Sequence, residues 1–560
     1  MIEEYNYIYK TQSICPVCRK PIPAGYVQKP GGGNSLSDES QDNCCCDCTC
    51  GTADSVFFVQ ECPEHGRFET LAAERAEDFR EWIKNPVINI PPVRAITRGA
   101  PGDDECPLHC GTCDNHLQTT CCVLIDVTRR CNQHCPYCFA LSGEDVDPSE
   151  PSLDEIGARY DWLLQQGEEG REFNIQLSGG EPTVRDDLPE IIRLAREKGF
   201  SYIQINSNGR RLAEEEDYAR VLKEAGASVI FMQFDGTRDD IYMKLRGEPL
   251  FEKKVQAVRN CEKAGLAVTL VPTVVRGVND DNIGEMMDFL VENVNVVKGI
   301  HFQPASFFGR YPEGDEMEGR ITMFGVLREL EAQRPAFRYS DSLPISTGHT
   351  LCCFYSTYIK EPDGTIRCTL TGKQRQEGVS CCDMSMADCC DTATDCFDTA
   401  TDCCDTAADC CDTATDCCDT ATDCCDTATD CCCGQPDSGV VSISCCDMTQ
   451  ADRLEVIKKD RDYVLDKWDI AVPEDSAGID NPDCCSGGEA AFASKYRSSD
   501  EITDLDEFLT YYRRNTFTVT GMAFQDITNL DAERLKRCRV VQMTDDYRLI
   551  PFCAYNTIYR

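Results

Sequence analysis

Short apolar segments with the composition of β-strands alternate with amphipathic helical segments over residues 121–304. Six segments carry the strand pattern: 123–128, 173–180, 202–209, 229–236, 267–275 and 299–304. Two helical segments between them, 188–199 and 251–265, close with glycine, as helices commonly do at their C-terminal ends. Strands that alternate with helices are joined by right-handed crossovers into a parallel sheet. The pattern predicts the α/β class, with a partial (β/α)6 TIM-like barrel over residues 123–340.

Three cysteines, Cys131, Cys135 and Cys138, directly follow the first predicted strand. Three thiolates in one short loop can hold three irons of a [4Fe–4S] cluster and leave the fourth iron open to a cofactor. A structural zinc site is the alternative, but it needs a fourth ligand and more often shows paired Cys-x2-Cys units. The spacing resembles the signature of radical S-adenosylmethionine (radical SAM) enzymes.

A Gly-Gly-Glu-Pro sequence ends the second predicted strand, and polar residues end the later ones. In a barrel these carboxyl ends face the active site. The alternative is that they are ordinary turn formers. The candidate cofactor-binding residues are Gly179, Gly180, Glu181, Pro182, Ser207, Asn208, Gln233 and Asp235, with Thr273 and Gln303 in the same register. The resemblance implies that the Gly-Gly-Glu-Pro segment binds the amino group of S-adenosylmethionine.

The chain has 42 cysteines in 560 residues, lacks a long apolar stretch, and begins without the basic-then-apolar order of a signal peptide. We therefore expect a cytoplasmic protein whose thiols are metal ligands rather than disulfides. Three further groups have ligand spacing. They are Cys15, Cys18, Cys62 and His65 for mononuclear zinc or rubredoxin-like iron; Cys106, Cys110, Cys113 and Cys121 for a second cluster; and Cys352, Cys353, Cys538 and Cys553 for a third. Cys368 competes for the third cluster, whereas Cys261 lies in an apolar helical pattern and is expected in the core.

Two insertions rich in cysteine and acidic residues interrupt this plan, at 31–55 and 376–488. The second contains the heptapeptide repeat CDTATDC between Cys390 and Cys431 and has few large apolar residues, so we expect it to be disordered. It is either a metal store or incidental low complexity. The expected organisation is a metal knuckle at 1–85, a cluster segment at 100–122, the barrel at 123–340, and a C-terminal cluster region at 341–375 plus 500–560, where a helix precedes a β-hairpin.

Acidic residues exceed basic ones by 97 to 55, which gives a formal charge of −42. Such a surface repels nucleic acid, so nucleic acid is excluded as a partner. Because high salt screens self-repulsion, this excess also favours a halophilic, archaeal source.

Motifs along nearly the whole chain outside the insertions resemble the archaeal tetraether lipid synthase family of radical SAM proteins, which includes members linked to pterin methylation. The matching segments are CPVCRKPIPA, ECPEHG, CPLHCGTCDNHLQTTC, LIDVTRRCNQHCPYCFA, LSGGEPT, QFDG, YMKLRG, LCCFYSTYI and IPFCAYN. The resemblance implies a rubredoxin-like site and several [4Fe–4S] clusters around a radical SAM barrel. Cys122 departs from the pattern by adding a thiol beside Cys121.

The resemblance implies an enzyme that generates a 5′-deoxyadenosyl radical for C–H activation, with carbon–carbon coupling of isoprenoid lipid chains as the leading hypothesis. Radical methylation of a pterin or another small heterocycle is the alternative, and a cysteine-rich metal store is a third. A long apolar tunnel would favour lipid, and a short polar pocket would favour a pterin. The expected partners are a small-molecule or lipid substrate and an electron donor such as ferredoxin or flavodoxin, with transient membrane contact if the substrate is lipid. No catalytic side chain is assigned, because the cofactor supplies the chemistry.

Overall fold

The computed structural model describes residues 7–30, 54–87, 106–143, 150–167, 173–312, 319–370 and 511–560, apart from 109, 111, 112 and 114, together with 89 and 314. The insertion at 376–488 and nearly all of the one at 31–55 lie outside these residues. Among the described residues, no helix is both long enough and apolar enough to cross a membrane.

The N-terminal unit is a four-stranded antiparallel sheet in the order β1-β2-β3-β4. Its elements are β1 (Tyr7–Ile14), β2 (Pro21–Lys29), β3 (Ser55–Cys62), β4 (Gly66–Ala73) and the helix α1 (Ala76–Trp82). The β1–β2 and β3–β4 turns lie at the same end of the sheet, because β2 runs antiparallel to both β1 and β3. These two turns carry the two predicted pairs of metal ligands.

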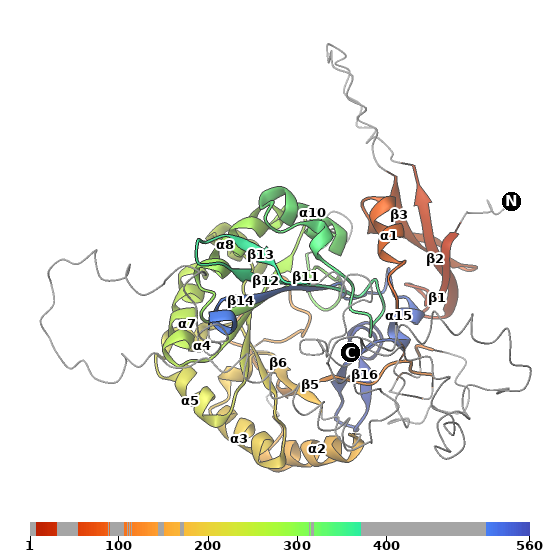
Figure 1. Ribbon diagram of the computed structural model, residues 1–560. Coiled ribbons are helices and arrows are strands. Elements are labelled where there is room, and N and C mark those ends of the chain that lie inside the picture. The colour runs from red at the N-terminus through yellow and green to blue at the C-terminus, as the bar shows by residue number, and fades with distance from the viewer. Residues whose placement is uncertain are drawn as a thin grey trace, which may run out of the picture. The chain divides into compact units, whose positions relative to one another are not determined.

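The central unit is the predicted barrel, and Figure 1 shows its helices forming an outer arc around the strands. The strands are β5 (Cys122–Thr128), β6 (Asn174–Gly179), β7 (Ile203–Ser207), β8 (Val229–Gln233), β9 (Val268–Val271), β10 (Thr273–Val274) and β11 (Val297–Pro304). The helices are α2 (Leu153–Gln166), α3 (Leu188–Lys198), α4 (Arg210–Glu214), α5 (Tyr218–Ala225), α6 (Asp239–Arg246), α7 (Phe251–Lys263), α8 (Ile283–Glu292) and α10 (Met323–Gln333), with 3-10 turns at Pro182–Val184, Asp280–Asn282 and Tyr339–Asp341.

Local sequence explains where these helices begin and end. Ser152 and Glu155 form a reciprocal capping box at the start of α2. Gly199 ends α3 with a φ of 110°, and Gly265 follows α7 with a φ of 63°, both in the left-handed region that glycine adopts without strain. Both glycines were predicted as helix ends. Cys261 of α7 is fully buried, as predicted for a core residue.

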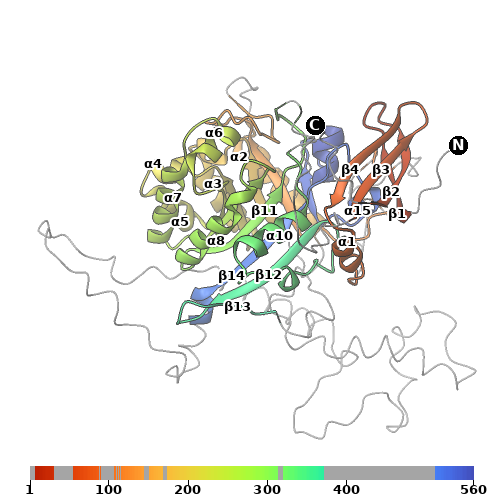
Figure 2. The same cartoon turned by 90° about the horizontal axis from the view of Figure 1, so that it is seen from above.

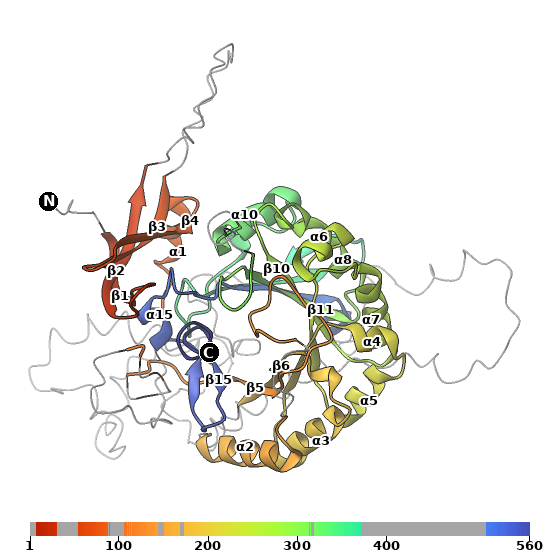
Figure 3. The same cartoon turned by 180° about the vertical axis from the view of Figure 1, so that it is seen from behind.

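The C-terminal segment adds strands to both sides of the barrel sheet. Its elements are β12 (Cys353–Lys360), β13 (Ile366–Cys368), β14 (Thr516–Met522), α15 (Ala532–Lys536), β15 (Val540–Met543), β16 (Leu549–Pro551), α16 (Phe552–Ala554) and a π-helical turn at Tyr555–Tyr559. β14 pairs in parallel with β11, and β15 pairs in parallel with β5 (Figure 3). The parallel part of the sheet therefore runs β15-β5-β6-β7-β8-β9-β11-β14. The predicted α/β barrel is confirmed, with two strands beyond the six read from the sequence.

One hydrophobic core joins the barrel to the N-terminal sheet. The Phe79 ring of α1 lies 6.3 Å from Phe324 of α10, and the Trp82 ring lies 5.7 Å from Phe324. Figure 2 shows the N-terminal sheet beside the barrel, next to the C-terminal segment. Asp531, just before α15, accepts hydrogen bonds from the hydroxyls of Thr11 (2.6 Å) and Tyr26 (3.0 Å), which ties this sheet to the C-terminal segment.

Candidate functional site

A cavity of about 440 Å³ opens at the carboxyl ends of the barrel strands. Cys131, Cys135 and Cys138 line its wall, on the loop that follows β5. Burial, reinforced by the nearby Glu181 carboxyl, raises the pKa of Cys131 to about 12. Without metal the Cys131 thiol therefore holds its proton at neutral pH, and metal binding would displace that proton. The structure thus brings the predicted triad to one wall of this cavity.

Three arginines from the segments that follow β7, β8 and β11 fix the backbone of the cysteine loop. Their donor–acceptor pairs are Arg210 Nη1 to Asn132 O (2.8 Å), Arg246 Nη1 to Tyr137 O (2.9 Å) and Arg310 Nε to Cys135 O (2.8 Å). Cys138 and Arg310 also exchange both backbone hydrogen bonds at 2.9 Å. The loop is therefore preorganised, and positive charge surrounds a site where thiolates would gather.

Gly179 and Gly180 bring the end of β6 against this loop. A Cβ on Gly179 would lie 2.0 Å from Thr128 O, and one on Gly180 would lie 2.1 Å from Arg130 O. The Gly180 and Glu181 N–H groups donate to these same two carbonyls at 2.9 Å. The space that side chains would occupy at these two positions is thus filled by protein backbone.

Glu181 is almost fully buried and organises the neighbouring strand end. Its carboxylate accepts from Thr183 Oγ1 (2.6 Å), Ser207 Oγ (3.0 Å) and the Asn208 N–H (2.5 Å). Burial raises the pKa of Glu181, and these hydrogen bonds oppose the rise. The motif therefore joins the ends of β6 and β7 into one rigid edge of the cavity.

Asp235 and Arg246 form a buried bidentate ion pair behind the cavity wall, with both N–O distances at 2.7 Å. Burial alone would lower the pKa of the Arg246 guanidinium, but the Asp235 carboxylate raises it above its ordinary value. Gln233 also donates to Asp235. Of the eight candidate cofactor-binding residues, Asp235 and Pro182 lie off the cavity surface, and the other six line it.

Sequence reasoning missed two cations at this site, Arg246 and Lys254. Lys254 Nζ donates to Asn208 O and, at 3.0 Å, to Gln233 Oε1. Burial lowers the pKa of Lys254 to about 8. Both residues lie on helices rather than at strand ends, so the rule that selected strand-end residues could not find them. Arg246 falls within the YMKLRG segment, which was the one available signal.

The two N-terminal hairpin turns form a compact ligand group. The ligand atoms of Cys15, Cys18, Cys62 and His65 all lie within 4.8 Å of one another, and no other group among the described residues meets this limit. Cys62 Sγ lies 3.5 Å from His65 Nδ1, and Cys18 Sγ lies 3.9 Å from Cys62 Sγ. Metal–sulfur bonds of about 2.3 Å in a tetrahedron place ligand atoms about 3.8 Å apart, so the group fits a mononuclear ion.

The C-terminal thiols gather beside α15. Burial, together with the nearby Cys553 and Cys352 thiols, raises the pKa of Cys538. Arg534 Nε lies 3.5 Å from Cys352 Sγ. Cys353 begins β12 and pairs with Met522. Cys368 pairs with Tyr358, five residues further along the same strand, and therefore lies about 17 Å from the position of Cys353. The structure thus separates Cys368 from the group for which it was a competing ligand.

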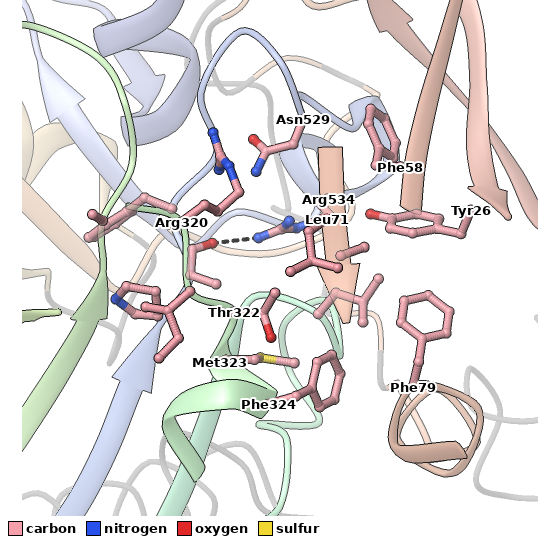
Figure 4. Close-up of a pocket in the computed structure, with 17 residues that line it drawn as sticks. Tyr26, Phe58, Leu71, Phe79, Arg320, Thr322, Met323, Phe324, Asn529 and Arg534 are labelled. Carbon is pink, nitrogen blue, oxygen red and sulfur yellow. Dashed lines mark hydrogen bonds between the residues drawn. The ribbon is translucent and has the colours of Figure 1, made fainter. Parts of the chain in front are cut away.

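Arg534 also borders a small cavity of about 60 Å³ between the N-terminal sheet, α10 and the C-terminal segment (Figure 4). Its Nη2 donates to Ala523 O at 2.5 Å. The same guanidinium therefore links this interface to the Cys352 thiol.

The segment before the barrel places its cysteines along the C-terminal segment. Burial raises the pKa of Cys106 to about 11, with Cys113 among its neighbours. Cys110 packs in a buried cluster with Cys553 and Ile14. The Cys121 N–H donates to Arg539 O at 3.0 Å, whereas the Cys122 thiol lies 3.4 Å from Gln176 Oε1. Cys122 thus contacts the barrel interior, which distinguishes it from Cys121.

This chain is similar to several known proteins. The radical SAM superfamily model matches residues 125–290. The 7,8-dihydro-6-hydroxymethylpterin dimethyltransferase of Methanocaldococcus jannaschii is 30% identical over 556 residues, covering 98% of this chain and 94% of the relative. The GTP 3′,8-cyclase of Nautilia profundicola is 25% identical over 226 residues, covering 39% of this chain and 69% of the relative. Among solved structures, Streptococcus suis SuiB bound to S-adenosylmethionine has a TM-score of 0.32 and 14% identity, covering 39% of this chain and 48% of that chain.

Proposed function

Because this chain belongs to the radical SAM superfamily, and within it to the family of the Methanocaldococcus jannaschii pterin dimethyltransferase, we propose that it catalyses radical methylation of a pterin or a related small heterocycle. It is an enzyme that depends on a [4Fe–4S] cluster and S-adenosylmethionine. When bound, that pair supplies one-electron cleavage and a radical able to take hydrogen from unactivated carbon. Ferredoxin or flavodoxin is the proposed electron donor.

The residues around the cavity fit this cofactor. Cys131, Cys135 and Cys138 would hold the cluster, since they share one wall and their loop supplies three thiols. Arg246 and Arg310 would hold the loop in place during the reaction, and the edge formed by Gly180 and Glu181 would bind the methionine part of S-adenosylmethionine. Protein side chains line the cavity, and together with a bound substrate they would shield the reactive carbon from water.

The proposed substrate class rests on the side chains that line the barrel interior. Seven residues with amide side chains line the cavity together with His301, namely Gln133, Gln176, Gln204, Asn206, Asn208, Gln233 and Gln303. Aromatic side chains line the other part of its wall, namely Tyr137, Phe139, Phe231, Phe308, Tyr311, Phe524 and Phe552. Amides can pair with the edges of a flat heterocycle and aromatic rings can cover its faces, whereas an alkyl chain would leave the Gln204 and Gln303 amides without partners. This combination favours a heterocycle over an isoprenoid lipid.

The remaining ligand groups support metal sites outside the cavity. We propose mononuclear zinc or iron at Cys15, Cys18, Cys62 and His65, on the basis of their spacing. Two auxiliary clusters would use the groups Cys106, Cys110, Cys113, Cys121 and Cys352, Cys353, Cys538, Cys553. Cys110 of the first group and Cys553 of the second belong to one buried cluster of side chains, which supports a close approach of the two groups.

The test uses anaerobically reconstituted, reduced protein with S-adenosylmethionine, given either 7,8-dihydro-6-hydroxymethylpterin or an archaeal diether lipid. We expect stimulated 5′-deoxyadenosine formation and a methylated product with the pterin only. Stimulation and coupled chains with the lipid only would replace this proposal by lipid coupling. A fully loaded protein that cleaves no S-adenosylmethionine with either compound would contradict both.

A further inference from the structure

His301 lies on β11 inside the barrel and faces the substrate cavity. Its Nδ1 is 2.8 Å from Thr520 Oγ1 of β14, and the Phe231 ring lies 5.3 Å from its own ring. It belongs neither to the cysteine loop nor to the Gly-Gly-Glu-Pro edge. It therefore lies outside the two segments assigned to the cluster and to the methionine part of S-adenosylmethionine.

The hydrogen bond from Thr520 to Ile300 favours one of the two neutral tautomers of His301. Thr520 Oγ1 donates its single proton to Ile300 O at 3.2 Å. The hydroxyl can then only accept from His301, so Nδ1 carries the hydrogen. Burial lowers the pKa of His301 to about 4, which keeps the ring neutral near pH 7. Nε2 is consequently a hydrogen-bond acceptor, and it has no partner among the described residues.

Two amide side chains in the same cavity also have hydrogen-bonding groups that no protein group uses. The side chains of Gln204 on β7 and Gln303 on β11 line the cavity, and neither has a hydrogen-bond partner within the described ranges. Gln303 is two residues beyond His301 on the same face of the strand, about 7 Å away along it. Phe231 supplies an aromatic surface beside them. A flat, bicyclic ligand with polar edges fits this set.

We propose that His301 Nε2 accepts a hydrogen bond from the ring N3–H of the substrate, and that this contact selects the 2-amino-4-oxopyrimidine edge of a pterin. The inference rests on the proposed function and deepens it. His301 is a specificity-determining residue here, and Thr520 is a positioning residue that fixes its tautomer. The acceptor rejects ligands whose N–H is replaced by a methyl group, because Nε2 would then lose its partner.

Paired substitutions separate the two ring nitrogens. In His301→Gln the amide reaches the position of Nε2, and in His301→Asn it reaches only the position of Nδ1. His301→Phe keeps the ring and removes both. The reconstituted holoenzyme is titrated with 6-hydroxymethylpterin and with its N3-methyl derivative, and binding is followed by pterin fluorescence. Binding of S-adenosylmethionine and the cluster absorbance are measured on the same samples to verify folding.

We expect wild type to prefer the unmethylated pterin, and His301→Phe to weaken its binding roughly 10- to 100-fold and abolish the preference. His301→Gln should retain most of the affinity, and His301→Asn should not. Rescue by Asn but not by Gln, or equal pterin binding by wild type and His301→Phe, would overturn this inference and leave the proposed function standing. If wild type binds neither pterin, the proposed function fails, and the inference fails with it.

Discussion

At the scale of single residues, the two glycines of the Gly-Gly-Glu-Pro segment let the end of β6 pack directly against the backbone of the cysteine loop. They do not leave a gap large enough for a ligand. Replacing Gly180 by alanine would place a Cβ 2.1 Å from Arg130 O and 2.8 Å from Arg129 O. Neither carbonyl can move without displacing the cysteine loop. We expect Gly180→Ala to cost about 1–3 kcal/mol of stability and to lower iron content and affinity for S-adenosylmethionine, measured by iron analysis and equilibrium dialysis.

Gly157→Ala is the matched control, since its Cβ would lie 3.5 Å from the nearest atom, Leu194 Cδ2. Gly157 is inside α2, where alanine is favoured by up to about 1 kcal/mol. Unchanged iron and cofactor binding in Gly180→Ala would contradict the role assigned to this glycine.

His349 makes the stability of the protein sensitive to acid. It is partly buried, and its Nδ1 accepts from the Leu351 N–H at 3.2 Å. Burial, with Arg534 and Arg537 nearby, lowers the pKa of His349 to about 3. The unfolded state then binds a proton that the folded state does not between about pH 6.5 and 3, so stability falls as the pH falls through this window.

From pH 7 to pH 5 this residue alone should cost about 2 kcal/mol of unfolding free energy. Urea unfolding at both pH values is the measurement, with His349→Gln as the comparison. The variant cannot titrate at this position, so its loss on acidification should be smaller by that amount. Equal losses in both proteins would show that His349 is not the titrating group.

At the scale of elements, two hairpin turns at one end of the N-terminal sheet create the mononuclear site. Cys62→Ser should remove most of the bound mononuclear zinc or iron, measured by mass spectrometry, and lower the thermal stability of this sheet. Val17→Ser is the control, because Val17 lies in the same turn with its side chain 59% exposed and contributes only its N–H to Cys15 Sγ. Full metal content in Cys62→Ser would rule out this ligand set.

Local patterns explain which elements could be predicted. The six barrel strands, the glycine-ended helices and the final helix and hairpin all follow from periodicity and terminal residues over a few positions. The placement of β14 and β15 does not, because each pairs in parallel with a strand more than 200 residues earlier in the chain. Likewise the cysteine triad could be recognised from the spacing of residues close together in the sequence. The tautomer of His301 could not be predicted in this way, because it depends on Thr520, 219 residues away.

At the scale of the whole molecule, the C-terminal segment completes the barrel sheet and carries the third group of thiols. The chain leaves the described structure after β13 and returns just before β14, and both strands pair with or flank β12. Ile366 pairs with Lys360, Thr516 pairs with Ile359, and the Tyr511 hydroxyl donates to Lys360 O at 2.6 Å. The two ends of this gap in the described chain are therefore held close together by β12.

This proximity makes the insertion at 376–488 removable. We expect a chain with a short Gly/Ser linker in its place to fold, retain the metal of the barrel and the knuckle, and form 5′-deoxyadenosine within about twofold of the full chain, because a linker costs little when its ends are already close. Iron and zinc contents and product formation are measured on both proteins after identical reconstitution.

If the insertion is a metal store, the full chain should bind many more metal ions than the shortened one under zinc excess. If the shortened chain instead loses the barrel metal, the insertion must contribute to cluster binding. The barrel, with the C-terminal strands that complete its sheet, would then not be sufficient for catalysis.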